Sequence, residues 1–343
     1  MGCNCSNGNE YISEIRNEMQ TNNDEQIEQN EQNEKENSLI EDEGDIIINI
    51  KQEKEKLMNK VSSKGYFLNK DIKAIIENIN PKVNSTKIPK ELKEKVQNKN
   101  NIKLPLMKMK DGSLYEGSWN KEGQREGFGI SLYNNKYIYK GLWENDVFNN
   151  YGCLFNNKEN YYYIGQFIDG KAKGKGELLI NNKIKYNGNF ENNLPNGKGN
   201  IIYLDEQIKY NGDIINGNKD GFGILEFKDG TKYEGEFKND KYNGKGKIIY
   251  SDNSEYEGYF KNNLKDGKGI FKWSNGNIYE GEFKNDKKHG KGKFTFKPNQ
   301  FYEGYWINDL AHGKGLYNIN GKIIEGIFKY GKMIIENNKN WFF

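Results

Sequence analysis

From Tyr115 onward, apolar and polar residues alternate in short runs that recur every 23 or 24 positions. Each period opens with Tyr-x-Gly-x-(Phe/Trp), continues through about six polar residues, and ends with Gly-x-Gly before a second short apolar run. Since residues two apart share one face of a strand, each copy predicts two half-buried β-strands. The opening residues of the nine copies are Tyr115, Tyr139, Tyr163, Tyr186, Tyr210, Tyr233, Tyr256, Tyr279 and Tyr302, and a degenerate tenth copy begins at Ile324.

Turn sequences between the copies make the predicted sheet a continuous meander. Dipeptides such as Asp229-Gly230 and Asn275-Gly276 stand between the second strand of one copy and the first strand of the next. Both residues tolerate positive φ, so we expect type I′ hairpin turns there. Mid-strand glycines such as Gly258 lie between two aromatic residues of one face and are expected to leave room for a neighbouring ring. The predicted fold class is all-β, an elongated antiparallel β-meander of nine to ten hairpin repeats.

Composition divides the chain into three parts. Residues 1–45 are rich in Asn, Gln and Glu and carry a net charge of −11, which favours a disordered, acidic tether. Residues 46–101 are expected to form a partly helical linker or N-terminal cap. Residues 102–343 are predicted to hold the repeat array and a C-terminal cap.

Two short helices are expected in the middle part. Asp71 is placed to cap a helix whose isoleucines share one face and which ends before Pro81, and a second helix is expected to start at Pro89. The isoleucines are Ile72, Ile75, Ile76 and Ile79. These helices either bind a partner or cover the open edge of the first repeat. We favour the covering role, because an open sheet edge promotes aggregation.

The first six residues, Met1-Gly2-Cys3-Asn4-Cys5-Ser6, fit the signal for N-myristoylation. A single myristoyl chain binds membranes only marginally, so stable anchoring needs a second signal. The acidic residues 1–45 offer no polybasic patch, and a palmitoylated cysteine is therefore expected to supply it. The predicted lipidation sites are Gly2, Cys3 and Cys5. The alternatives are an unmodified start and a Cys-x-Cys metal site, which lacks partner ligands.

The remaining composition excludes several classes of protein. The chain has no apolar run of 18 or more residues and no hydrophobic signal peptide, so no membrane-spanning helix is predicted. Cys153 is the only cysteine within the repeats, which fits a reducing compartment without disulfide bonds.

Lysines recur in register along the array. Residues 46–343 carry a net charge of +14, and six copies read Gly-Lys-Gly. Near an anionic leaflet each lysine contributes about 1 kcal/mol, so this column is a candidate contact for anionic lipid. We favour the alternative, in which the lysines pair with a column of glutamates for only tenths of a kcal/mol. The lysines are Lys175, Lys198, Lys245, Lys268, Lys291 and Lys314, and the glutamates are Glu234, Glu257, Glu280, Glu303 and Glu325.

The sequence Tyr-Glu-Gly-Glu-Phe-Lys-Asn-Asp…Gly-Lys-Gly at 233–246, nearly repeated at 279–292, resembles the MORN repeat. The resemblance extends over residues 102–331. Three copies depart from it: the first carries one extra residue before Gly127, Asn150 replaces the first glycine of Gly-x-Gly in the second, and Ile214 replaces Phe/Trp in the fifth. The resemblance implies a twisted β-meander of MORN-type repeats that serves in scaffolding, membrane association and self-assembly, and it implies no chemistry.

The C-terminus carries two apolar runs, Met333-Ile334-Ile335 and Trp341-Phe342-Phe343. One interpretation is a cap over the last strands. The other is an edge that pairs with a second copy, giving a homodimer through the C-terminal repeats, as the resemblance also implies.

No catalytic, cofactor or metal site is expected. No Gly-Lys is followed by Ser or Thr, so a Walker-type loop is absent from the sequence. His289 and His312 occupy equivalent points of adjacent copies, expected to be turn residues too far apart to share a metal. The pattern offers no set of nucleophile, base and orienting group. Nucleic-acid stacking needs exposed rings, whereas these rings are expected inside.

The leading functional hypothesis is a non-catalytic scaffold tethered by myristate and palmitate to the cytoplasmic face of a plasma, ciliary or cortical membrane. It would present its repeats to other proteins, with phosphoinositide as a further ligand. The first alternative is a structural component of a cytoskeletal or ciliary assembly. The second is a targeting or regulatory subunit for a lipid kinase or a similar enzyme.

Overall fold

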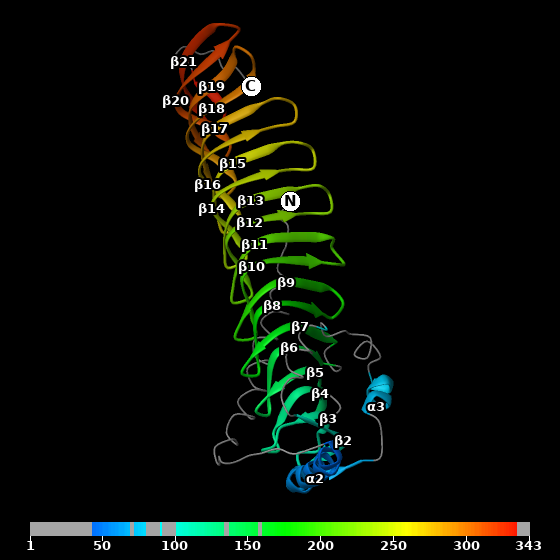
Figure 1. The fold of residues 1–343 in the computed structure, drawn as a ribbon. Helices are drawn as coiled ribbons and strands as arrows, with labels where there is room; N and C mark the ends of the chain where they lie inside the picture. The colour runs from blue at the N-terminus through cyan, green and yellow to red at the C-terminus, as the bar shows by residue number, and fades with distance from the viewer. Residues whose placement is uncertain are drawn as a thin grey trace. The chain divides into compact units, whose positions relative to one another are not determined.

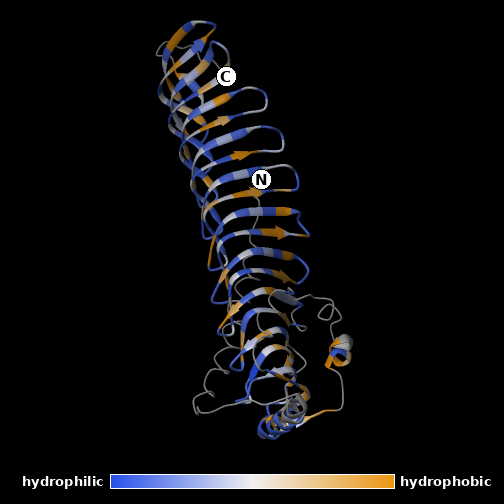
Figure 2. Cartoon of the chain, viewed as in Figure 1, coloured by the Kyte–Doolittle hydropathy of each residue, from blue (hydrophilic) through white to orange (hydrophobic). Residues whose placement is uncertain are grey.

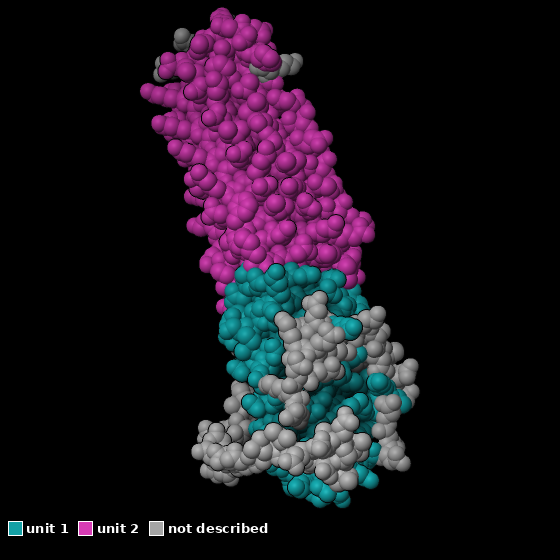
Figure 3. Space-filling model, viewed as in Figure 1, with its two compact units in different colours: residues 1–197 teal, residues 198–343 magenta. Residues whose placement is uncertain are grey.

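The computed structural model describes residues 43–68, 72–79, 90, 101–133, 137–156 and 160–334. They fall into two compact units, residues 1–197 and residues 198–343 (Figure 3). The predicted lipidation sites Gly2, Cys3 and Cys5 lie outside the described residues, as do residues 91–100, which include most of the second expected helix, and the C-terminal residues 335–343.

Antiparallel strands dominate both units, which confirms the predicted fold class. The described part of the chain contains 22 strands assigned to one sheet, and within each unit the strands follow one another in chain order (Figure 1). Orange and blue residues alternate along most strands, as the sequence pattern requires (Figure 2).

The described residues of unit 1 include the helices α2 and α3, a 3-10 turn and the first strands. They are α2 (Glu43–Val61), η1 (Ser62–Lys64), β1 (Gly65–Phe67), α3 (Ile72–Ile79), β2 (Ile102–Met109), β3 (Leu114–Trp119), β4 (Arg125–Tyr133), β5 (Tyr137–Glu144), β6 (Val147–Asn156), β7 (Tyr161–Ile168), β8 (Lys171–Ile180), β9 (Ile184–Glu191) and the beginning of β10 (Leu194–Tyr203).

Unit 2 contains the rest of β10 and the strands that follow it. They are β11 (Ile208–Ile215), β12 (Asn218–Glu226), β13 (Lys232–Lys238), β14 (Lys241–Ile249), β15 (Glu255–Lys261), β16 (Leu264–Lys272), β17 (Ile278–Lys284), β18 (Lys287–Lys297), β19 (Gln300–Ile307), β20 (Leu310–Ile319), β21 (Lys322–Lys329) and β22 (Lys332–Ile334). The last two strands form the degenerate tenth hairpin.

One tyrosine per repeat forms the centre of the packing. Tyr256 is 0 % exposed, and its ring lies over the pair Gly258 and Gly269, which face each other across β15 and β16. A methyl group on Gly258 would lie 2.5 Å from both the Tyr256 hydroxyl and Gly269 Cα. The hydroxyl donates a hydrogen bond to the Tyr259 carbonyl at 2.9 Å. The expectation that these glycines make room for a ring is therefore confirmed.

The first glycine of each Gly-x-Gly has a different role. Gly267 has a φ of 105°, and the pairing of β15 with β16 shifts register between Gly258 and Phe260. This combination marks a β-bulge, which bends the strand. Asn150 takes the same place in the second copy with a φ of 63°, so asparagine preserves the bulge because it tolerates the left-handed region.

The predicted location of the type I′ turns was wrong at Asp111-Gly112, Asp229-Gly230 and Asn275-Gly276. Only the glycine has positive φ there, whereas Asn320-Gly321 has it at both residues. At Asp229 the loop is a three-residue hairpin in which the carboxylate accepts a hydrogen bond from the Thr231 backbone N–H at 2.9 Å. The side chain thus stabilises a turn that does not need positive φ at its own residue.

Positive φ at two successive residues occurs instead inside the repeats, at the turn between the first and second strands. The pairs include Asn239-Asp240, Asn262-Asn263, Asn285-Asp286 and Asn308-Asp309. At Asp240 the backbone N–H donates to the Lys219 carbonyl at 2.9 Å, and the carboxylate accepts from the Lys219 N–H at 2.9 Å. These reciprocal hydrogen bonds connect each turn to the preceding repeat.

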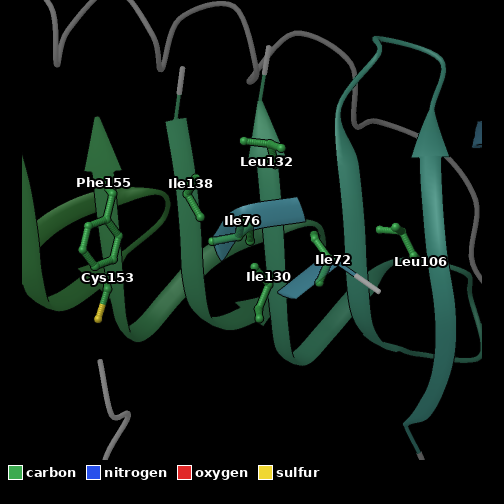
Figure 4. Close-up of a cluster of buried hydrophobic side chains, with 8 residues drawn as sticks. All are labelled: Ile72, Ile76, Leu106, Ile130, Leu132, Ile138, Cys153 and Phe155. Atoms are coloured by element: carbon green, nitrogen blue, oxygen red, sulfur yellow. The ribbon is translucent and has the colours of Figure 1, made fainter. Parts of the chain in front are cut away.

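The predicted helix over residues 72–79 is confirmed as α3, but it lies on the face of the sheet and not on its edge. Ile72 and Ile76 are 0 % exposed and pack on the strands of the first copies (Figure 4). The strand residues of this cluster are Leu106, Ile130, Leu132, Ile138, Cys153 and Phe155. Burial raises the pKa of the Cys153 thiol to about 12.

The edge next to β2 is covered by other elements. The three-residue strand β1 pairs with β2, and the end of α2 packs nearby, where Lys60 donates to the Lys121 carbonyl at 3.1 Å. Helix α2 begins at Glu43, just before the expected boundary at residue 46. The edge is therefore covered by β1 and α2, for which this role was not predicted, and not by α3, for which it was.

Candidate interaction surfaces

The six Gly-Lys-Gly lysines lie on the face opposite the buried tyrosines, and their neighbours differ from repeat to repeat. Lys198 makes an ion pair with Asp213 at 2.7 Å. Lys245 lies over the Tyr259 ring at 5.7 Å, and Lys291 over the Tyr305 ring at 5.5 Å. The remaining three are Lys175, opposite Asn189, Lys268, opposite Glu282, and Lys314, opposite Ile327.

The expected pairing of these lysines with the glutamate column was wrong. Glu234 and Glu257 both face Lys247, and Glu303 faces Lys293 with an ion pair of 3.4 Å. Two more members of the column, Glu280 and Glu325, face Ile270 and Leu316, although Glu280 also faces Lys293 on its other side. The pair of facing glycines, such as Gly269 and Gly281, lies between the lysine column and the glutamate column, so the two columns do not face each other.

A second set of lysines, not recognised from the sequence, flanks the type I′ turns of unit 2. We call these the turn lysines. Each is exposed, and in three turns the two lysines that flank the turn face each other directly across the hairpin. Like charges in that position are destabilising. The turn lysines are Lys238, Lys241, Lys261, Lys284, Lys287, Lys329 and Lys332.

Exposed apolar side chains stand among the turn lysines. Leu264 and Tyr330 belong to the same turns, and the turn at Asn308-Asp309 carries Ile307 and Leu310 in place of lysine. These side chains are between 37 % and 64 % exposed. Cationic side chains mixed with exposed apolar ones are typical of surfaces that contact the interface of a membrane.

Other cations are buried against the tyrosine column. Lys219 forms an ion pair with Asp240 at 3.0 Å, with side chains 6 % and 8 % exposed, and its ammonium lies 5.8 Å from the Tyr210 ring. Burial alone would lower the pKa of Lys219, but Tyr203 and Asp240 raise it overall. In unit 1, Arg125 and Asp146 pair at 2.9 Å in the equivalent position. These charges are internal and are not available to a partner.

Lys288 differs from these cations because rings surround its ammonium. Trp306 lies 4.5 Å and Phe294 4.6 Å from the nitrogen, and burial lowers the pKa of Lys288 despite the field of Asp309. The arrangement is a cation–π box filled by the protein's own side chain.

A groove of about 830 Å³ lies in unit 1 between the second and fourth copies. Its lining includes Glu144, Ile168 and Glu191, which occupy equivalent positions in three consecutive repeats. It also includes the equivalent residues Asn149, Lys173 and Asn196 next to the bulges.

The charged residues of the groove are Glu144, Glu191 and Lys173, which give a net charge of −1. Glu144 accepts a hydrogen bond from Asn149 at 2.7 Å, and Glu191 pairs with Lys173 at 3.0 Å. Gln166 also lines the groove, and its side-chain oxygen accepts from the Lys175 backbone N–H at 2.8 Å. The corresponding acceptors in unit 2 include the carboxylates of Asp213 and Glu236. The amide thus keeps the structural hydrogen bond while removing the negative charge.

The histidines lie in strands rather than in the turns where they were expected. His289 faces Glu282 and His312 faces Tyr305. Among the residues that the structure describes, no group of three His, Cys, Asp or Glu side chains is arranged to hold a metal ion. The described helices include none that is long and apolar enough to cross a membrane.

Comparison with known proteins places the repeats in a family. The model of the MORN repeat matches nine segments, which together make up more than half of the chain. They are residues 115–136, 139–158, 163–183, 186–205, 210–232, 233–255, 256–278, 279–300 and 302–319. The comparison with curated proteins gave no significant match.

Solved structures include a partial likeness. The SAS-4 (dCPAP) TCP domain in complex with a proline-rich motif of Ana2 (dSTIL) of Drosophila melanogaster is similar over 46 % of this chain and 85 % of that chain. The identity is 13 % and the TM-score 0.30, so this likeness carries no functional argument. The nine matched repeats, with their buried tyrosines and paired glycines, show that the chain belongs to the MORN-repeat family.

Proposed function

We propose that this protein is a non-catalytic scaffold, held at the cytoplasmic face of a membrane by acyl groups on Gly2 and on Cys3 or Cys5. The observation that carries the proposal is the sequence Met1-Gly2-Cys3-Asn4-Cys5-Ser6 in a chain whose folded part is a MORN-repeat array. Repeat arrays present long surfaces to partners. Two acyl chains give the stable anchoring that one chain alone does not.

The turn lysines of unit 2 support a second contact with the membrane. Their mutual repulsion across the hairpins would be relieved near anionic headgroups, where each lysine contributes about 1 kcal/mol within a Debye length. The nearby apolar side chains Leu264, Ile307 and Leu310 could enter the headgroup region. The turn lysines replace the Gly-Lys-Gly column as our candidate for anionic lipid, including phosphoinositide, because lysines face each other across three of these hairpins. Within this set Lys238 also has an ion pair with Asp220 at 3.1 Å.

Fractionation of eukaryotic cells tests the proposal. Wild-type protein, Gly2→Ala and Cys3→Ser/Cys5→Ser are expressed, and the share that pellets with membranes is measured. We expect both variants to become largely soluble. Gly2→Ala that pellets but is released by detergent would assign the attachment to the repeats alone. Gly2→Ala that pellets and resists detergent would contradict the proposal and favour a cytoskeletal or ciliary assembly. A lipid kinase that co-purifies in fixed ratio with soluble variants would favour the regulatory-subunit alternative.

A further inference from the structure

The lining of the groove in unit 1 repeats with the period of the fold. Neighbouring strands are about 4.8 Å apart, so equivalent residues of consecutive two-strand repeats are separated by about 9.6 Å. Glu144, Ile168 and Glu191 therefore present contacts at about 9.6 Å intervals, and Asn149, Lys173 and Asn196 follow the same interval on the intervening strands.

This interval selects the conformation of a bound chain. A polyproline II helix turns once in three residues with a rise of about 3.1 Å each, giving a repeat of about 9.3 Å. A β-strand returns to the same face every 6.7 Å or so, and an α-helix completes a turn in about 5.4 Å. Only the polyproline II repeat brings an equivalent residue of the ligand to every copy of the groove.

The chemistry of the lining agrees with the spacing. A polyproline II segment makes no internal hydrogen bonds, so its carbonyl groups need donors. Because the Gln166 side-chain oxygen accepts from the Lys175 N–H, the amide nitrogen is the donor that this side chain offers to such a carbonyl, and Asn189 lines the groove one repeat further on. Ile168, which lines the groove and is 48 % exposed, offers an apolar contact for a proline ring.

The charges of the groove further restrict the class of segment that it can bind. Glu144, Glu191 and Lys173 are its charged residues, and Lys173 already pairs with Glu191. An acidic or phosphorylated segment would therefore meet a surplus of negative charge, whereas a neutral or basic segment would not.

We propose that this groove binds a proline-rich, non-acidic segment of a partner protein in the polyproline II conformation. The inference rests on the proposed scaffold function, since it names the class of protein that the scaffold would hold. A preformed polyproline II segment loses little conformational entropy on binding.

The test is fluorescence anisotropy of a labelled proline-rich peptide with basic ends, titrated with the full-length protein. A Thr-Val alternating peptide of equal length and charge reports binding of a strand, and a proline-rich peptide with glutamate ends reports the charge selection. We expect the basic proline-rich peptide to bind at least tenfold more tightly than either control.

Two matched variants locate the binding. Ile168 and Ile215 hold the same position in the third and fifth copies and are 48 % and 49 % exposed, but only Ile168 lines the groove. We expect Ile168→Lys to weaken binding of the peptide at least tenfold and Ile215→Lys to leave it unchanged, with equal thermal midpoints. Asn189→Ala is expected to weaken binding severalfold.

No binding by the wild-type protein, equal affinity for the three peptides, or an equal loss in both isoleucine variants would overturn the inference. The assay uses purified protein without membranes, so its result does not depend on acylation. Failure of the peptide assay with normal membrane attachment removes the ligand class and leaves the tethered scaffold in place. Normal peptide binding without membrane attachment would remove the tether and leave the groove assignment in place.

Discussion

At the scale of single residues, each repeat is organised by a tyrosine ring over two facing glycines. The ring excludes water from the sheet, and its hydroxyl satisfies the carbonyl three residues on, as Tyr256 does for Tyr259. Burial raises the pKa of Tyr256, so the hydroxyl stays a donor throughout the physiological range. The glycines leave the space that the ring fills, and any side chain there would collide with it.

Gly258→Ala should therefore destabilise the protein by about 1–3 kcal/mol, the usual range for overpacking a core. The added methyl group would be forced against Gly269 Cα and the Tyr256 ring. The comparison is Gly276→Asn, at a turn where nothing lies within 4 Å of an added carbon and where asparagine tolerates positive φ. Thermal denaturation should show a lower midpoint for Gly258→Ala and little change for Gly276→Asn. Equal midpoints would refute this packing role.

Cys153 reports on the contact between α3 and the sheet. In a Cys3→Ser/Cys5→Ser background it is the only thiol, it is 0 % exposed, and its pKa of about 12 disfavours the reactive thiolate in the folded protein. We expect it to resist a disulfide reagent at pH 8 and to react at least tenfold faster after Ile76→Ala, which loosens the packing of α3. A rapid reaction of Cys153 in the Cys3→Ser/Cys5→Ser protein that retains Ile76 would show that α3 does not protect this face of the sheet.

Residue patterns predicted much of this packing. The Tyr-x-Gly-x-(Phe/Trp) spacing identified the buried face and the glycine slots correctly. It did not reveal that Asn-Asp and Asn-Asn pairs such as Asn239-Asp240 would occupy the type I′ turns, because an Asp-Gly dipeptide is the stronger signal and stood elsewhere. In those Asp-Gly loops the aspartate side chain stabilises a different turn.

At the scale of elements, the turns connect neighbouring repeats. Where the second turn residue is Asn or Asp, as at Asp240 and Asn263, it exchanges two hydrogen bonds with the preceding repeat, and an aspartate there can also hold a buried cation. The sequence could not show this connection, since its partners lie 21 residues apart in different copies.

Asp240→Asn should destabilise unit 2 by about 3 kcal/mol, because it leaves the Lys219 ammonium buried without its counter-ion. Asparagine keeps the turn and the backbone hydrogen bond, as Asn263 does in the next repeat. Asp286→Asn is the matched control, since Asp286 is 44 % exposed and lies 3.5 Å from Lys265, and it should change the free energy of unfolding by 1 kcal/mol or so at most. Urea denaturation distinguishes the two, and equal effects would contradict the role of burial.

The pair of Arg125 and Asp146 should make part of unit 1 sensitive to acid. Burial alone would raise the pKa of Asp146, but Arg125 and Lys64 together lower it below its usual range. A lowered folded-state pKa gives a stabilisation that is complete above the unfolded value of about 3.9 and is lost as the pH falls through the folded value.

Hydrogen exchange of β4 to β6 between pH 6 and pH 3 measures this loss. Wild-type protein should lose protection there below about pH 4, and the difference from Asp146→Asn should shrink over the same range. A difference that stays constant to pH 3 would show that Asp146 does not titrate in this window.

Helix α3 itself was predicted from the sequence, but the surface on which it packs was not. Its isoleucine spacing identified the helix and its buried face, yet the sequence did not say which surface that face would meet. Helix α3 packs on the first copies because apolar residues such as Ile130 and Ile138 lie on that face of the sheet there. The corresponding positions in later copies are more polar.

At the scale of the whole molecule, we propose membrane attachment through the N-terminus and the turn lysines, and partner binding in the groove of unit 1. The repeat family was evident from the sequence. The groove was not, because its lining brings together residues of three copies, such as Glu144, Ile168 and Glu191, that lie far apart in the sequence.

Vesicle binding separates the two sets of lysines. Unacylated full-length protein should bind vesicles containing phosphatidylserine, and Lys284→Glu/Lys287→Glu should weaken binding at least tenfold, since two favourable charges become two unfavourable ones. Lys291→Glu/Lys314→Glu, which alters the Gly-Lys-Gly column by the same charge, should have a smaller effect. Raising the salt concentration should remove the difference. The reverse order of the two variants would restore the Gly-Lys-Gly column as the lipid contact.

The most direct test of the scaffold is recruitment in cells. A fluorescent reporter carrying the basic proline-rich peptide is co-expressed with wild-type protein, Gly2→Ala or Ile168→Lys, and the share of reporter at the membrane is measured. The account predicts that the wild-type protein brings the reporter to the membrane and that Gly2→Ala leaves both in the cytosol. It also predicts that Ile168→Lys stays at the membrane without the reporter. A reporter distributed equally in all three cells would contradict the account.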